Sequence, residues 1–259
     1  MINLKEKLKK NEFTIGSWIT LGHPSIAEIM ARIGFDWLTV DMEHSAITLH
    51  PAQQLIQIID LCGVVPLVRI GENDPVIIKR VMDAGAHGVI VPMVNTKEDA
   101  LKAVSAAKYP PVGTRGVGLA RAQGYGLEFK RYKEWVNKGS IVIVQIEHIK
   151  GVENLEEILS VDGVDAFIVG PYDLSGSLGM PGNFTHPSMR NALKRIMNVS
   201  KKFKRTAGFH VIPPDAKEIN NKIREGYRFI SFSLDTLFLG VKCKEEMERI
   251  KEQRLKLKL

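Results

Sequence analysis

Two short apolar runs near the middle of the chain constrain its fold most strongly. Residues 141–146 (IVIVQI) and 166–169 (AFIV) are rich in Val and Ile and too short to be buried helices, which is typical of strands buried on both faces. Between them, residues 151–160 have apolar side chains at helical spacing. This strand–helix–strand order predicts one unit of a parallel sheet.

Each of these two strands is followed by a carboxylate. Glu147 comes directly after the first strand and Asp173 follows shortly after the second. Parallel neighbours bring their carboxyl ends to one rim of the sheet, where two acids would repel each other unless a cation lies between them. Carboxylate oxygens suit Mg²⁺ or Mn²⁺, so the sequence predicts a divalent-metal site at this rim.

The same alternation of strands and helices runs through the whole chain. We expect strands at residues 14–20, 36–43, 64–70, 88–94, 141–146, 166–169, 207–211 and 229–234. We expect helices at residues 24–34, 51–62, 75–84, 96–107, up to about 138, 151–160, 187–204, 215–225 and from 237 onward. Eight strands in 259 residues, with no linker, predict a single α/β domain over residues 1–259, folded as a (β/α)₈ TIM barrel.

Composition and charge restrict the partners. The formal net charge is +7, and much of the excess lies in residues 5–10, 201–205 and 242–258, which are interpreted as solvated helix faces. No aromatic–basic motif accompanies the charge, so no nucleic-acid partner is expected. No apolar run approaches the ~20 residues that span a bilayer, and the N-terminus lacks the apolar core of a secretory signal. With only two cysteines, far apart, a cytoplasmic location is expected.

Ionisable and polar residues are concentrated where the expected strands end, which is where active sites of such barrels lie. This rim set is Trp18, Asp41, Glu43, His44, Arg69, Pro92, Met93, Gln145, Glu147, Pro171, Asp173, His210 and Asp235. No lysine lies within the eight strands, which disfavours Schiff-base chemistry. A metal held by carboxylates, with Arg69 beside a developing oxyanion and a neutral His44 as general base, suits enolate chemistry on a 2-oxo acid.

Several longer motifs now point to a family. They are DMEHS (41–45), VRIGEND (68–74), VMDAGAHGVIVPMV (81–94), YPPVGTRGVG (109–118), QIEH (145–148) and GPYDLSGSLGMPG (170–182). With them the chain resembles the HpcH/HpaI aldolases, the class II enzymes that use a divalent metal to cleave or form 2-oxo acids. The resemblance implies reversible cleavage of a 4-hydroxy-2-oxo acid to pyruvate and an aldehyde, with Mg²⁺ or Mn²⁺ as cofactor and Co²⁺ as a third option.

The resemblance also implies roles for individual residues. Glu147 and Asp173 look like the metal ligands, Arg69 like the arginine beside the enolate oxygen, and His44 like the acid/base histidine, paired with Asp83. The remaining implied substrate-binding residues are Trp18, Gln145, Gly170, Pro171 and Tyr172. A homo-oligomer is implied as well, commonly a hexamer built as a trimer of dimers, with the last helix packed on a neighbouring subunit.

Two residues depart from the family pattern. Tyr172 stands where an alanine is usual, and His148 where Ser or Thr is common, so the identity of the substrate is open. Other interpretations also remain: an oxaloacetate decarboxylase or a CoA-ester lyase on the same scaffold, or a non-catalytic protein that binds an acidic partner. Arg69 could instead serve as a structural ion-pair partner of Asp41 or Glu43.

Overall fold

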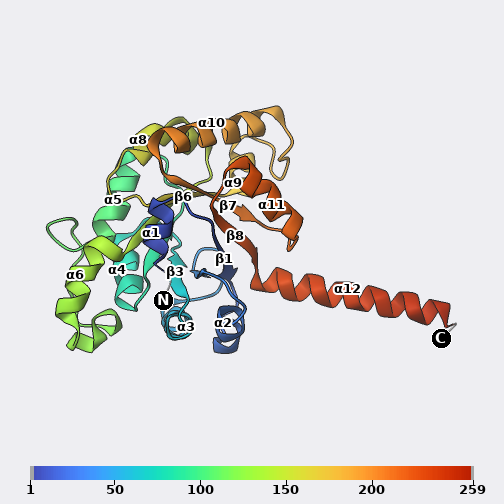
Figure 1. The fold of residues 1–259 in the computed structure, drawn as a ribbon, viewed down its shortest axis with the longest axis horizontal. Coiled ribbons are helices and arrows are strands. Elements are labelled where there is room, and N and C mark those ends of the chain that lie inside the picture. The colour runs from blue at the N-terminus through green and yellow to red at the C-terminus, as the bar shows by residue number, and fades with distance from the viewer. Residues whose placement is uncertain (1–2, 258–259) are drawn as a thin grey trace.

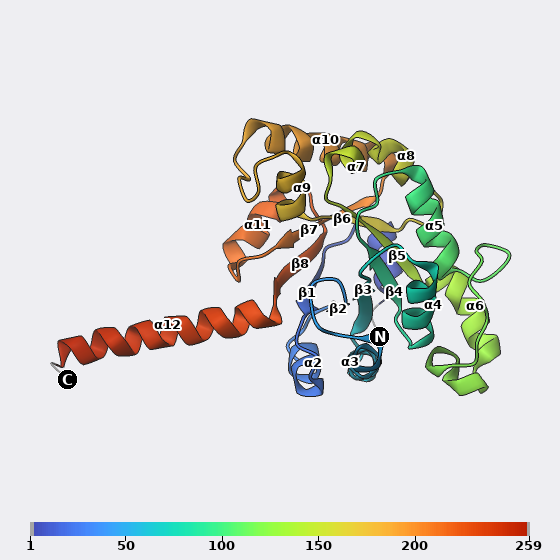
Figure 2. The ribbon, with the colours of Figure 1, turned by 180° about the vertical axis from the view of Figure 1, so that it is seen from behind.

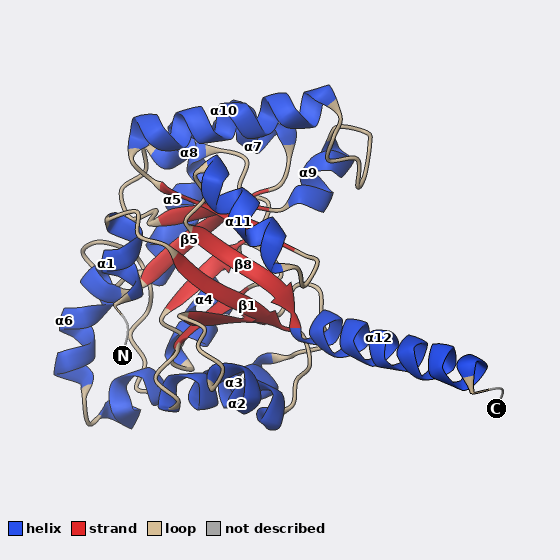
Figure 3. Cartoon of the chain, turned by 45° about the vertical axis from the view of Figure 1, so that its right-hand side comes forward, coloured by secondary structure: helices blue, strands red, loops and turns tan. Residues whose placement is uncertain are grey.

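Eight parallel strands close into a barrel in the computed structural model, which describes residues 3–257. They run in sequence order around the barrel, each paired with the next, and β8 pairs with β1 (Figure 3). The strands are β1 (Thr14–Ile19), β2 (Trp37–Asp41), β3 (Val65–Arg69), β4 (Gly88–Val91), β5 (Ile141–Ile146), β6 (Ala166–Val169), β7 (Thr206–Val211) and β8 (Phe229–Leu234). The predicted TIM barrel is therefore confirmed.

Helices surround the barrel, as the two opposite views in Figures 1 and 2 show. They are α1 (Leu4–Lys9), α2 (Pro24–Ala31), α3 (Leu49–Leu61), α4 (Pro75–Asp83), α5 (Lys97–Ala107), the 3₁₀ segment η1 (Arg121–Gly126), α6 (Phe129–Gly139), α7 (Ile149–Glu153), α8 (Leu155–Leu159), α9 (Pro171–Ser177), α10 (Pro187–Phe203), α11 (Ala216–Glu225) and α12 (Asp235–Lys256). No helix among residues 3–257 is long and apolar enough to cross a membrane.

Helix starts follow from local sequence. The Asp74 carboxylate accepts hydrogen bonds from the backbone N–H groups of Val76 and Ile77 at the start of α4, and Pro75 occupies the first turn, where its missing N–H costs nothing. Thr96 and Asp99 form a reciprocal capping box at the start of α5. Each cap satisfies backbone donors that the helix itself leaves free.

The inside of the barrel is a compact apolar cluster that includes Trp18, Trp37 and Phe229. The rings of Trp37 and Phe229 stack with centroids 4.2 Å apart and planes 11° from parallel. Helix α1 closes the amino-terminal end of the barrel, because its Leu4 and Leu8 belong to the same cluster. The carboxyl-terminal end is thus the open one.

The Asp235 carboxylate links the start of α12 to the residues that follow β1, next to the place where β8 pairs with β1. Asp235, at the start of α12, accepts hydrogen bonds from the backbone N–H groups of Thr20 and Leu21 at 2.9 and 2.8 Å and from the Thr20 hydroxyl at 2.6 Å. Asp235, expected at the rim, is therefore buried there as a structural link between residues about 215 positions apart.

Four segments differ from the sequence expectation, and one of them is the 3₁₀ segment η1, which no expected helix covers. Helices α1 and α9 were not expected, since each is short and carries little apolar periodicity. The helix expected at 151–160 is divided into α7 and α8 at Asn154, whose side chain bonds the backbone oxygen of Asn95 and whose φ/ψ are not helical. The basic stretch in α1 is also less solvated than expected, because Lys5 and Lys7 pair with Asp165 and Asp36.

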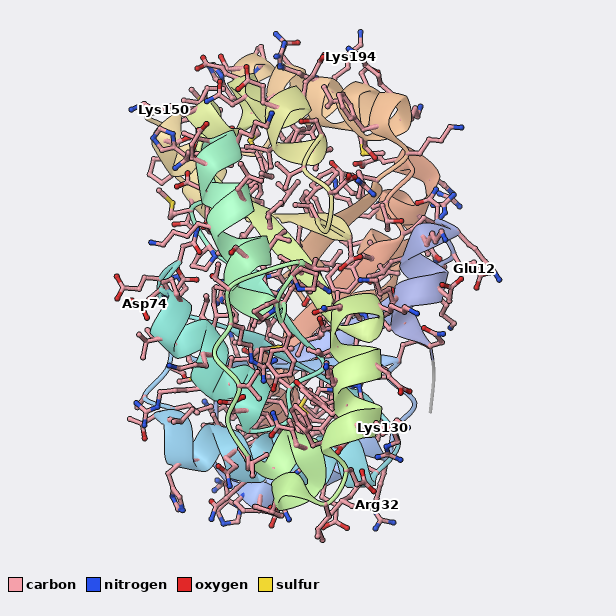
Figure 4. All side chains as sticks on the ribbon, turned by 90° about the vertical axis from the view of Figure 1, so that its left-hand side faces the viewer. Glu12, Arg32, Asp74, Lys130, Lys150 and Lys194 are labelled. Carbon is pink, nitrogen blue, oxygen red and sulfur yellow. The ribbon has the colours of Figure 1, made fainter. Side chains whose placement is uncertain are left out.

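Most other charged side chains extend outward from the covering helices. The labelled residues in Figure 4 include Lys130, Lys150 and Lys194 on the outside of α6, α7 and α10. Helix α12 behaves differently from the others, since it leaves the barrel and projects away from it (Figure 1). Only Asp235 of its residues is buried.

The tight packing around Trp37 gives a test of the barrel interior. A Cβ atom at Gly16 would lie 2.1 Å from the Trp37 ring, so Gly16→Ala must displace a buried indole. We expect the free energy of unfolding, measured by urea titration, to fall by about 1–3 kcal/mol. The matched control is Gly176→Ala in α9, where an added Cβ meets open space. An equal effect of the two substitutions would contradict this account of the interior.

Candidate active site

A cavity of about 180 Å³ opens at the carboxyl ends of the strands. Most of the residues that the sequence pointed to line it: Trp18, His44, Arg69, Gln145, Gly170, Pro171, Tyr172 and Asp173. They come from β1, β3, β5 and the turns after β2 and β6, so the parallel order of the barrel alone brings them together. His210, also expected at this rim, and Ile212, which was not singled out, complete the wall at the end of β7.

Arg69 is held rigidly at the base of this cavity. Its Nε and Nη2 donate to the two carboxylate oxygens of Asp41 at 3.0 and 2.6 Å, and its Nη1 lies 3.3 Å from Glu43 Oε2. The guanidinium also lies over the Trp18 ring, 4.2 Å from its centroid. Burial alone would raise the pKa of Asp41, but the hydrogen bonds and charge of Arg69 lower it below its ordinary value. The Arg69–Asp41 ion pair, which the sequence offered as a structural role for Arg69, is therefore present. It fixes the guanidinium group where it faces the cavity.

Glu147 is almost fully enclosed, with 3% of its surface exposed. Its Oε1 accepts a hydrogen bond of 2.7 Å from the backbone N–H of Met93, and its Oε2 accepts one from the Gln145 side-chain amide. A Cβ on Gly170 would lie 2.9 Å from Oε2, so this carboxylate needs glycine beside it. Burial raises the pKa of Glu147, the two hydrogen bonds lower it, and the negative charge of Asp173 raises it again.

The donor set around Glu147 fits a hard divalent cation. Each oxygen of Glu147 has one protein hydrogen bond and therefore keeps lone-pair capacity, and the charge of Asp173 acts on it unfavourably until a cation intervenes. The buried Oε1 of Gln145 is a further acceptor without a partner. Within residues 3–257 no three His, Cys, Asp or Glu residues converge as a complete ligand cage. Two carboxylates are the usual protein share for Mg²⁺, which keeps several waters.

His44 lies at the open side of the cavity, with its side chain 62% exposed. Its Nε2 is 3.8 Å from Glu43 Oε2. Burial raises the pKa of Glu43 to about 7, Arg69 opposes that shift, and Glu147, Asp41 and Asp173 add to it. The histidine thus has a buried acid on one side and free access to a ligand on the other.

Asp83 is not part of this site within one chain, contrary to the expected pairing with His44. It ends α4, which runs back from β3 toward the amino-terminal end of the barrel. There its carboxylate bonds the Arg115 guanidinium at 2.5 Å, and Arg115 also donates to the Tyr132 hydroxyl at 3.0 Å. A pairing of Asp83 with His44 therefore requires a second copy of the chain.

One contribution to the site was left open by the sequence, and one was not recognised from it. The sequence offered Asp41 or Glu43 as the partner of Arg69, and strand register is the signal that decides, because Asp41 stands opposite Arg69 in the β2–β3 pairing. The Met93 N–H that bonds Glu147 depends on a left-handed backbone at Met93 (φ 52°), for which a non-glycine residue gives no sequence signal.

No lysine is among the described residues that line the cavity. The buried Lys108, whose pKa is lowered by burial to about 7, instead donates to the carbonyl and hydroxyl oxygens of Ser140, directly before β5 at the opposite end of the barrel. The described lining residues therefore offer no amine that could form a Schiff base with a substrate in the cavity.

Comparison with known proteins identifies the family to which this arrangement belongs. Residues 14–239 match the family described as HpcH/HpaI aldolase/citrate lyase. The chain belongs to this family. The HpcH/HpaI resemblance inferred from the motifs is therefore confirmed, and with it the assignment to the carbon–carbon lyases.

Individual relatives of the family cover nearly the whole chain. A 2-keto-3-deoxy-L-rhamnonate aldolase from Escherichia coli is 37% identical over 235 residues, which is 90% of this chain and 87% of the relative. A solved HpcH/HpaI aldolase/citrate lyase family protein from Burkholderia cenocepacia has a TM-score of 0.91 at 32% identity and covers 97% of this chain and 100% of its own. An HpcH/HpaI aldolase from Desulfitobacterium hafniense has a TM-score of 0.88 at 32% identity, with 96% of each chain covered.

The Arg69–Asp41 pair gives a test that combines stability and pH. Asp41→Asn leaves a buried guanidinium with one anionic partner fewer, so we expect a loss of about 3 kcal/mol in the free energy of unfolding at pH 7. Because the folded-state pKa of Asp41 lies below its ordinary 3.8, its contribution is present above about pH 4 and is lost as the pH falls through that lowered pKa.

Urea titrations of both proteins from pH 7 to pH 3 check this. The difference in the free energy of unfolding between wild type and Asp41→Asn should become smaller as the pH falls below about 4. The exposed Asp162→Asn is the matched control and should change stability by less than about 0.5 kcal/mol. A difference between wild type and Asp41→Asn that grows on acidification would refute the assignment.

Proposed function

We propose that this protein is a divalent-metal-dependent aldolase that reversibly cleaves a 4-hydroxy-2-oxo acid to pyruvate and an aldehyde. One observation carries the proposal: a buried carboxylate, Glu147, lies against Gly170 of a small cavity that is also lined by Asp173 and by an arginine held by Asp41. Mg²⁺ or Mn²⁺ is the expected cofactor, with Co²⁺ as a third option, and the expected substrates are small 2-oxo acids and aldehydes.

In this proposal Glu147 and Asp173 hold the cation, which supplies Lewis-acid polarisation of the 2-oxo acid. Arg69 provides a fixed positive charge for the oxygen that becomes negative when the pyruvate methyl group loses a proton. Because two acids hold its guanidinium, that charge needs no rearrangement during the reaction.

The remaining cavity residues bind and orient. Gln145 fixes the Glu147 carboxylate, and its free Oε1 is available to a donor on the ligand. Gly170, Pro171 and Tyr172 form the turn against which the pyruvate carboxylate would lie, and Trp18 forms an apolar wall. His44 moves the proton as general acid and base, since it is exposed to the cavity and beside Glu43.

Proton–deuterium exchange at the pyruvate methyl group, followed by NMR in D₂O, tests this half-reaction without knowledge of the aldehyde. With Mg²⁺ or Mn²⁺ we expect exchange that EDTA abolishes and that added metal restores. Glu147→Ala should lower the rate by at least about a hundredfold, because it removes one of two protein ligands.

The exposed Glu157→Gln on α8 is the matched control and should exchange like the wild type. Absence of exchange with every metal would exclude the pyruvate-aldolase proposal and favour the CoA-ester lyase or the binding protein. Turnover of oxaloacetate without an aldehyde, faster than any aldol cleavage, would favour the decarboxylase.

We also propose that α12 packs on another copy of the chain in a homo-oligomer, the expected hexamer. Leu239, Cys243, Met247 and Ile250 recur at spacings of four, four and three residues and are exposed, so α12 carries an apolar stripe that its own barrel does not cover. In Figure 3 no helix lies across β8 and β1, the position that the last helix of a barrel would occupy. In the proposed assembly a second copy of α12 would cover that position, and Asp83 would pair with His44 of another copy.

Light scattering coupled to size-exclusion chromatography tests the role of α12. Met247→Glu together with Ile250→Glu should convert the oligomer into smaller species, because two charges would be buried in an apolar contact. Lys251→Glu together with Glu252→Lys, on the same helix, is a control that keeps the stripe intact. A monomeric wild type, or an oligomer unaffected by the two glutamates, would refute the proposed contact.

A further inference from the structure

The cavity has an aromatic residue at its rim, Tyr172, and the structure gives that residue a defined place. Tyr172 is among the residues that line the cavity, and 52% of its surface remains exposed. An aromatic surface of this kind beside a small polar cavity favours an apolar ligand group that would cover it.

The ring is held from behind by the loop that follows α9. Phe184 packs edge-on against it, with centroids 5.1 Å apart and planes at 89°. The backbone of this loop reverses at Gly182, whose φ of 77° is accessible mainly to glycine. The two rings thus come from separate segments, since Tyr172 lies in α9 and Phe184 in the loop that follows it.

Ser175 ties these two segments together. Its buried hydroxyl donates to the backbone oxygen of Tyr172 at 2.8 Å and accepts from the backbone N–H of Gly182 at 2.9 Å. Since both hydrogen-bonding directions of one hydroxyl are used, the loop cannot move away from Tyr172 without leaving a buried polar group unpaired. The backbone that carries Tyr172 and the loop that carries Phe184 are thus fixed relative to each other.

The charges around this wall indicate what it does not bind. Arg69 is the only lysine or arginine among the described lining residues, and Asp41 and Glu43 already neutralise it. His210, beside Trp18 and near Arg69, is neutral because burial and then the charge of Arg69 lower its pKa to about 3. A second carboxylate or a phosphate on the substrate would therefore find no further lysine or arginine among the described lining residues.

The aldehyde half of the substrate must extend from the pyruvate position toward the remaining apolar wall. That wall includes Tyr172 at the start of α9 and Ile212 directly after β7, beside Ile168 and Val169 of β6. We propose that Tyr172, supported by Phe184 and Ser175, binds the aldehyde fragment and selects one that is uncharged and apolar or aromatic. This inference rests on the proposed aldolase function and names the class of aldehyde that the site accepts.

The experiment measures kcat/KM for aldol addition of pyruvate to three aldehydes with the full-length protein and its metal. They are benzaldehyde, D-glyceraldehyde and succinic semialdehyde. We expect the wild type to prefer benzaldehyde to D-glyceraldehyde by about tenfold, as ring packing allows, and to use succinic semialdehyde least. Tyr172→Ala should abolish this preference, whereas Tyr172→Phe, which keeps the ring, should retain it.

Phe184→Ala tests whether Phe184 supports the Tyr172 ring. It should reduce the preference for benzaldehyde over D-glyceraldehyde less than Tyr172→Ala does. A wild-type preference for succinic semialdehyde, or a ratio unchanged in Tyr172→Ala, would overturn the inference. Methyl exchange of pyruvate by the wild type distinguishes a failure of the aldehyde assignment from a failure of the aldolase proposal. If exchange occurs and the ratios fail, only the aldehyde assignment is wrong, whereas absence of exchange overturns both proposals.

Discussion

The register of two neighbouring strands determines most of the site. Ile146 of β5 stands opposite Val169 of β6, so the residues that follow, Glu147 and Gly170, meet at the rim. Because Gly170 has no side chain, the Glu147 carboxylate can lie against its backbone and still receive the Met93 and Gln145 donors. A shift of one residue in this pairing would turn Glu147 away from the cavity.

The charge distribution of the molecule has opposite signs at the site and on the surface. Asp41, Glu43, Glu147 and Asp173 surround one guanidinium, so four carboxylates against one cation leave three negative charges if all are ionised. The chain as a whole carries a formal charge of +7, mostly on its outer helices. An acidic centre inside a basic protein attracts a small cation to the cavity and anionic substrates to its surroundings.

Strand pattern and family motifs were enough to predict the barrel and nearly all cavity residues, because both depend on local sequence and parallel order. The features that the sequence could not predict depend on contacts between residues distant in the chain or on the local backbone conformation. Asn154 divides one expected helix by bonding Asn95, and Met93 donates to Glu147 only through a left-handed backbone. The motif also could not tell which copy of the chain Asp83 serves; within one chain Asp83 binds Arg115.

The carboxylate that links β8 to β1 has a consequence for the order in which the protein folds. Asp235 binds Thr20 and Leu21, and Thr14 of β1 pairs with Phe229 of β8, so neither contact can form until the ribosome has made nine-tenths of the chain. Until then the first strand has one unpaired edge, and Trp18, on which Arg69 rests, lacks one of its two neighbouring strands. The barrel and its cavity are therefore completed together, as a late event in the life of the nascent chain.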